Sequence, residues 1–119
     1  MTVTFNTKNG NVDIANDVIA TLVGTSTTEV IGVVGMTSRN AVRDTARQIL
    51  RQENFERGVV VNSDKNGTSI DVFIVVRYGV KISEVAKNVQ ERVRFNLENQ
   101  LGLFDVAVNI FVQNVRVED

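Results

Sequence analysis

The chain has 119 residues, of which 43% are hydrophobic and 23% charged, and its formal net charge is −1. This length supports one domain with its own core, over residues 1–119, and the near-neutral charge excludes a global attraction to nucleic acid or membrane. The absence of Cys excludes disulfides and thiolate metal sites, and the absence of His removes the commonest general base.

The N-terminal residues are polar and lack the apolar core of a signal peptide. No apolar run approaches the roughly 20 residues that a membrane-spanning helix requires. These features predict a cytoplasmic protein.

The first elements in chain order are two short strands followed by a helix. Apolar residues alternate over 3–5 and 12–14, on either side of the turn signal Asn9-Gly10. The period then changes and predicts a helix over about 15–30, capped by Asn16 or Asp17.

A second helix is predicted over about 39–53, after the short apolar segment Ile31–Met36. Next comes a strand at 58–61, and the polar stretch 62–67 reads as a hairpin loop.

The following strand, residues 70–78, is the centre of the expected sheet. Ile70, Val72, Ile74 and Val76 make one apolar face, and Phe73 with Val75 makes the other face apolar as well. Because both faces are apolar, we expect cover on both sides in the middle of this strand.

A long amphipathic helix is predicted over 82–101, with Ser83 as a cap or first-turn residue and Gly102 as the stop. The last strand, from Phe104 to Val112, has an even apolar face, whereas Val115 falls on an odd position. This change of parity predicts a β-bulge near Gln113-Asn114. The predicted buried stripe of the helix consists of Ile82, Val85, Ala86, Val89, Val93, Leu97 and Leu101.

These elements predict an α+β fold: a two-layer sandwich of a mixed or antiparallel sheet with about three helices, in a KH-like ββααββαβ order. Gly32-Val33-Val34-Gly35 has the GxxG pattern of the KH loop that clamps a nucleic-acid backbone. Its central valines carry no charge for phosphate and favour burial, which argues against nucleic acid. A KH-like nucleic-acid-binding protein remains the alternative function.

No motif for catalysis, metal or cofactor binding is present, and we expect no enzyme, no cofactor, no metal and no small-molecule substrate. Asp13, Asp17 and Asp64 are acidic but lack the spacing of an EF-hand. The charges of the long helix fall at three- and four-residue spacing, typical of a solvated face.

Four arginines, Arg39, Arg43, Arg47 and Arg51, recur every four residues along the second predicted helix. Such a cationic flank can hold phosphates, anionic lipid headgroups or an acidic partner. The other interpretation is a solvated face whose arginine stems cover core residues.

The long helix also carries an aromatic residue away from its apolar stripe. Phe95 stands about 200° around the helix from Val93. We predict that Phe95, with Arg92 and Glu91, belongs to a self-association or partner-binding face. An isolated exposed phenylalanine without function is the alternative.

In Gly32–Met36 and Arg77–Val93 the sequence resembles the alkaline shock protein family, also called the Gram-positive envelope stress response proteins. The resemblance extends to the Val12–Ile14 entry into the first helix and to the closing Val106–Val115 run, and covers roughly residues 10–117. It is closest to the short form, a single domain without charged extensions.

The resemblance implies a cytoplasmic, non-enzymatic scaffold or interaction protein of the envelope stress response and cell-envelope homeostasis. Some longer members are held at the membrane by another, membrane-anchored protein and self-assemble, which implies a protein partner and peripheral membrane association. Short forms are linked to fatty-acid and phospholipid metabolism, and an accessory role there is a further reading. The family has no established catalytic residues to carry over.

Overall fold

The computed structural model describes residues 2–38, 55, 57–64 and 67–117. The predicted helix over 39–53, with its four arginines, lies outside the described residues. In chain order the elements are β1 (Thr2–Thr7), β2 (Gly10–Ala15), α1 (Asn16–Thr28), β3 (Val33–Met36), β4 (Val59–Asp64), β5 (Gly67–Arg77), α2 (Ile82–Asn96), the π-helical turn η3 (Leu97–Leu101) and β6 (Ala107–Arg116).

Strand β5 is the centre of a mixed four-stranded sheet, as its sequence predicts. β6 runs parallel to it, and β3 and β4 pair with it antiparallel. The N–H of Phe73 donates a hydrogen bond to the Gly58 carbonyl, and the Phe73 carbonyl accepts one from the Thr37 N–H, both at 3.1 Å. Since both backbone groups of one strand residue point to the same edge, β4 and β3 follow each other along one edge of β5 and β6 lies along the other.

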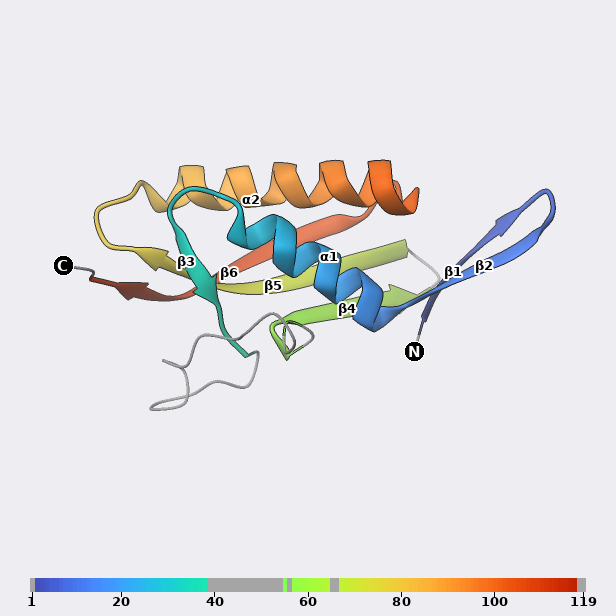
Figure 1. The fold of residues 1–119 in the computed structure, drawn as a ribbon, viewed down its shortest axis with the longest axis horizontal. Helices are drawn as coiled ribbons and strands as arrows, with labels where there is room; N and C mark the ends of the chain where they lie inside the picture. The colour runs from blue at the N-terminus through green and yellow to red at the C-terminus, as the bar shows by residue number, and fades with distance from the viewer. Residues whose placement is uncertain (1, 39–54, 56, 65–66, 118–119) are drawn as a thin grey trace.

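Both described α-helices cover the same face of this sheet (Figure 1). The even-numbered residues of β5 from Ile70 to Val76 face them and are fully buried. The predicted helical stripe is confirmed over its middle, although Ile82 at the start of α2 is exposed. The helix side chains that complete this core include Ile19 and Val23 of α1 and Val85, Val89, Val93 and Leu97.

The opposite face of β5 is also buried in its middle. Phe73 and Val75 are both buried, which confirms the predicted cover on both sides. Phe73 stacks on Phe111 of β6, with ring centroids 5.0 Å apart and an interplanar angle of 16°. Phe111 therefore points away from the helices, as strand parity predicts.

The hairpin of β1 and β2 extends from the body of the protein (Figure 1). The strands pair from Thr2 with Ala15 to Thr7 with Gly10, and the turn consists of residues 8 and 9. Buried Val3 and Ile14 join the base of the hairpin to the core. The predicted pair of strands is confirmed.

The predicted caps of α1 are wrong, and Ser83 of α2 is a first-turn residue and not a cap. Ala15 is the N-cap of α1 and Lys81 that of α2, and neither makes a side-chain cap hydrogen bond. In α2 the N–H groups of Glu84 and Val85 both donate to the Lys81 carbonyl, which satisfies the first turn through the backbone. Ser83 thus lies in the first turn of α2, one of its two predicted positions. Asn16 and Asp17 lie inside α1, which follows β2 without an intervening loop.

The segment after α1 differs from the KH-like order. Val33–Met36 form β3 and pair with β5, so a strand follows α1 where the prediction had a loop between two helices. Gly35 and Met36 are buried and do not form an exposed loop for a phosphate backbone. The described elements therefore show an α+β fold without the KH-like order.

The C-terminal strand begins later than predicted. β6 starts at Ala107, after Asp105 has adopted a left-handed backbone with φ of 61°, and Phe104 is exposed. The pairing with β5 shifts between Val112 and Asn114, which confirms the predicted bulge. Gly102, with φ of 69°, ends the long helix as predicted, although the last turn is the π-helical η3.

Candidate functional site

The candidate site lies on the outer surface where α1 and α2 pack against each other. The helices are antiparallel, because Asp17 at the start of α1 lies near Gln100 of η3, whereas Glu29 at the end of α1 lies near Asn88 in the middle of α2. The Asn96 side-chain amide donates to Ser26 Oγ at 2.6 Å, and Ser26 Oγ donates to the Leu22 carbonyl at 2.7 Å. Ser26 is almost fully buried, so this chain of bonds ties the two helices together at a fixed place.

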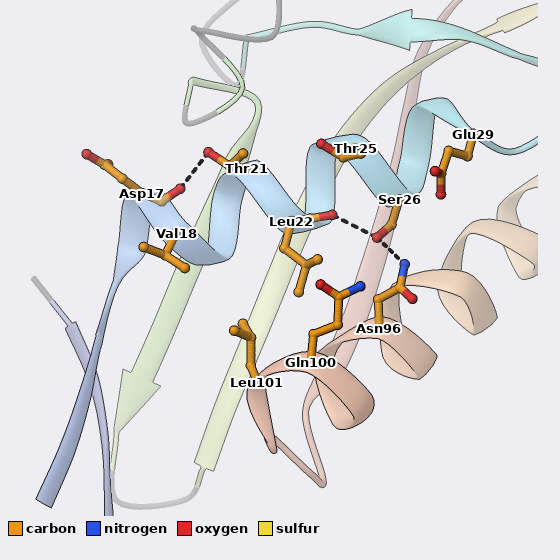
Figure 2. A pocket seen from close by; sticks show the side chains of 10 residues that line it. All are labelled: Asp17, Val18, Thr21, Leu22, Thr25, Ser26, Glu29, Asn96, Gln100 and Leu101. Atoms are coloured by element: carbon orange, nitrogen blue, oxygen red, sulfur yellow. Dashed lines mark hydrogen bonds between the residues drawn. The ribbon is translucent and has the colours of Figure 1, made fainter.

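Two adjoining hollows lie along this helix pair and share Glu29. The first has a volume of about 540 Å³ and is shown in Figure 2. Leu22 of α1 and Leu101 of η3 face each other across it, and Val18 adds a half-exposed apolar side chain. Its lining residues are Asp17, Val18, Thr21, Leu22, Thr25, Ser26, Glu29, Asn96, Gln100 and Leu101.

The second hollow, of about 460 Å³, contains the residues predicted from the long helix. Phe95 is 61% exposed and lies there with Arg92 and Glu91, so the structure brings the three predicted residues together. Their role in binding stays a prediction. The full lining is Glu29, Val30, Ile31, Asn88, Glu91, Arg92 and Phe95.

Sequence reasoning missed Ile31, which lines the same hollow as Phe95. It follows α1 in a turn and is 87% exposed, the most exposed of the large apolar side chains that the structure describes. The only signal in the sequence was its position between a predicted helix end and Gly32. Its place opposite α2 depends on the antiparallel packing of two helices that are far apart in the chain.

The chemistry of these hollows is that of a recognition surface. They offer apolar side chains for burial, and their charged lining residues Asp17, Glu29, Glu91 and Arg92 are exposed. The hydroxyls that line the first hollow belong to Thr21, Thr25 and Ser26, and those of Thr21 and Ser26 donate to helix carbonyls. Such groups can bind and orient a protein surface through burial and charge pairing.

The other acidic candidates do not come together. Asp13 on β2 accepts a hydrogen bond from Thr4 Oγ1 at 2.7 Å, Asp17 lies in α1, and Asp64 ends β4. Among residues 2–38, 55, 57–64 and 67–117, no group of three or more acidic side chains is arranged to hold a metal ion. The arginine ladder Arg39, Arg43, Arg47 and Arg51 lies outside the described residues, and its role stays a prediction.

The helices that the structure describes include none with the length and apolar character needed to cross a bilayer.

Comparison with known proteins agrees with the resemblance in the sequence. A model of the alkaline shock protein 23 family, described as having a cell-envelope-related function, matches residues 4–117. The uncharacterised protein Spy1614 of Streptococcus pyogenes is 57% identical over 98% of this chain and 97% of its own length. The uncharacterised protein YloU of Bacillus subtilis is 46% identical over 98% of each chain.

A more distant relative, the uncharacterised protein YqhY of Bacillus subtilis, is 35% identical over 92% of this chain and 79% of its own length. No solved structure matches the chain. The family model covers nearly all of the sequence, including both helices and every described strand except the first two residues of β1. The chain therefore belongs to the alkaline shock protein 23 family, which has a cell-envelope-related function.

Proposed function

We propose that this protein is a non-enzymatic interaction protein of the envelope stress response, which binds a protein partner through the outer face of α1 and α2. The observation that carries the proposal is the position of Phe95 and Ile31. These two large apolar side chains, 61% and 87% exposed, line one hollow whose remaining surface is largely polar and charged.

An apolar pair of this kind fits the anatomy of a protein interface. Binding energy is concentrated in a few buried anchors, most often aromatic, while surrounding polar groups exclude water and set orientation. Phe95 and Ile31 supply the anchors, and Glu29, Glu91 and Arg92 form the charged surroundings. Arg92 is placed to pair with an acidic side chain of the partner.

The first hollow extends the same face along the helix pair. Because both hollows share Glu29, a partner segment seated on Phe95 can continue towards Leu22 and Leu101. The charged residues that line the first hollow, Asp17 and Glu29, are both acidic. The surface is best matched by a partner that has apolar residues for the two hollows and basic residues to pair with Asp17 and Glu29.

The non-enzymatic part of the proposal is supported by the chain's chemistry. It contains no His and no Cys, and the charged groups of the candidate site are exposed on helix surfaces. Catalytic groups usually work in sites that exclude water. The cell-envelope setting comes from the family, and attachment to the membrane through another protein or a role beside lipid metabolism rests on the resemblance alone.

The test is Phe95→Ser, compared with Phe104→Ser as a matched control. Phe104 is 65% exposed and lies outside both hollows, so the two substitutions remove equally exposed rings. Partner capture from the native host, with nuclease and detergent controls, should fall in Phe95→Ser alone. Loss of an anchor of about 2 kcal/mol weakens binding by roughly 30-fold.

Thermal unfolding and sedimentation of the same proteins complete the test. Both variants should unfold within a few degrees of the wild type, because an exposed ring contributes little to stability. Equal capture by both variants would contradict the proposed face. A large loss of stability in Phe95→Ser alone would show that Phe95 belongs to the core. Loss of capture after nuclease or detergent would point instead to nucleic acid or lipid.

A further inference from the structure

In the part of the chain that the structure describes, strand β6 pairs with β5 alone, which leaves its other edge without a partner strand. The Val108 carbonyl points away from β5, because it accepts a hydrogen bond from the side-chain amide of Gln90 at 2.8 Å. Residues two apart in a strand orient their backbone groups alike, so the N–H and C=O groups of Ile110 and Val112 also point outward.

Side chains of this protein close the edge at both ends of that short stretch. At one end the Gln90 side-chain amide donates a hydrogen bond to the Val108 carbonyl. At the other end the strand bulges between Val112 and Asn114, and the Asn114 side chain accepts the N–H of Val115 at 2.9 Å. Among the described residues, none forms a hydrogen bond with the outward backbone groups of Ile110 and Val112 between these two closures. An open strand edge of this kind is a template for pairing with another strand.

This open stretch is complementary to itself. If two copies meet antiparallel about a two-fold axis at Phe111, Ile110 of each copy lies opposite Val112 of the other. Each such pair exchanges both of its N–H···O=C bonds. The pairing ends at Gln90 on one side and at the bulge on the other. The outward N–H and C=O groups of Ile110 and Val112 in one copy therefore all find partners in the second copy.

The side chains favour the same arrangement. Phe111 is 43% exposed and stacks on Phe73. In the antiparallel pair it faces Phe111 of the second copy in a non-hydrogen-bonded position, where Cβ atoms are about 4.5–5.5 Å apart. The aromatic stack then continues across the junction and buries the exposed part of both rings.

The strand also lacks the usual protection against self-pairing. Edge strands commonly carry lysine or other charges, yet residues 107–115 contain no ionisable side chain. The strand itself therefore brings no like charges together when two copies pair. We propose that the outer edge of β6 joins two copies of this chain into a two-fold dimer with one continuous sheet, through Ile110–Val112. This surface is separate from the α1–α2 face and does not depend on the proposed function.

A proline at position 112 removes the backbone N–H that would bond to the second copy and leaves the sheet within each copy intact. Val112→Pro deletes an N–H that points outward, so no bond to β5 is lost. The control is Val115→Pro, which also changes an outward N–H but lies beyond the paired stretch. Sedimentation over a dilution series should show a dimer that dissociates on dilution for the wild type and for Val115→Pro, and a monomer for Val112→Pro.

Single cysteines give a second measurement that does not require a proline in the strand. The chain has no Cys, so Phe111→Cys and Phe104→Cys each contain one thiol, both at positions that are exposed in the wild type. Under mild oxidation, Phe111→Cys should form a disulfide-linked dimer at least about tenfold faster than Phe104→Cys does. Pairing of two copies raises the effective concentration of the thiols at position 111. Phe95→Ser should leave the dimer intact.

The proposal is overturned by a wild-type protein that stays monomeric at every concentration, or by equal rates of disulfide formation in the two cysteine variants. It is also overturned by a folded Val112→Pro protein that keeps the dimer mass. If Val112→Pro fails to fold, the cysteine rates decide. Failure of these tests leaves partner capture by the α1–α2 face unaffected, which keeps the two proposals distinguishable.

Discussion

Ile74→Ala is expected to lower the free energy of unfolding by about 2–5 kcal/mol, the usual range for truncating a buried isoleucine. Ile74 has no exposed surface and lies in β5, the strand that all other strands of the sheet contact. It pairs with Met36 of β3 on one side and with Val112 of β6 on the other. Truncation therefore leaves a cavity between the sheet and the helices that cover it, where the paired strands cannot move independently to fill the space.

Equilibrium denaturation in urea measures this effect, with Ile31→Ala as the matched control. Ile31 is exposed in the second hollow, so the same substitution there should change stability by no more than about 0.5 kcal/mol. Similar losses in the two variants would contradict the assignment of β5 as the centre of the core.

Gly24→Ala is expected to destabilise the protein by about 1–3 kcal/mol, although helix propensity alone favours alanine by about 1 kcal/mol. Gly24 is buried within α1. A Cβ at this position would overlap the Phe55 ring and would lie 2.9 Å from the Phe55 Cβ. Because the contact includes the base of the Phe55 side chain, rotation of the ring cannot relieve it.

The control for Gly24→Ala is Thr21→Ala, at an exposed position of the same helix. Within the described part of the chain its hydroxyl bonds to the Asp17 carbonyl of the same helix, so the free energy of unfolding should change by no more than about 0.5 kcal/mol. A Gly24→Ala protein at least as stable as the wild type in urea would show that Phe55 does not pack against α1.

Regular periodicity made the centre of this fold predictable. Alternation over β5 identified a strand that is buried on both faces, and the spacing of Val85, Val89 and Val93 identified the buried side of α2. The bulge in β6 followed from a change of parity at Gln113-Asn114. These patterns are local in the sequence, and packing in the core favours the same strands and helix that they predict.

The errors occurred where tertiary contacts decide the structure. Strand β3 has only four residues and begins with two valines without alternation, and it is held by pairing with β5 far along the chain. The predicted caps Asn16 and Asp17 were wrong, and Ser83 does not cap α2, because the N-cap residue of neither helix makes a side-chain hydrogen bond. The missing side chain of Gly24 allows close packing with Phe55, a contact that the helical pattern does not show.

The candidate site was predictable only in part. The helical position of Phe95 relative to Val93 showed that its ring would face solvent, and the structure confirms its exposure. Its neighbour Ile31 and the two hollows arise from packing between α1 and α2, fixed by the Ser26–Asn96 hydrogen bond across 70 positions of sequence. Periodicity within one helix contains no information on that contact.

The most direct test of partner binding by the α1–α2 face is photo-crosslinking in living cells of the native host. A photoreactive phenylalanine analogue at position 95 is compared with the same analogue at position 104, which is equally exposed but outside the hollows. Binding at this face predicts that position 95 crosslinks to one defined protein other than the chain itself, identified by mass spectrometry, while position 104 does not. Crosslinking at position 95 that is no stronger than at position 104, or that yields only the chain itself, would contradict it.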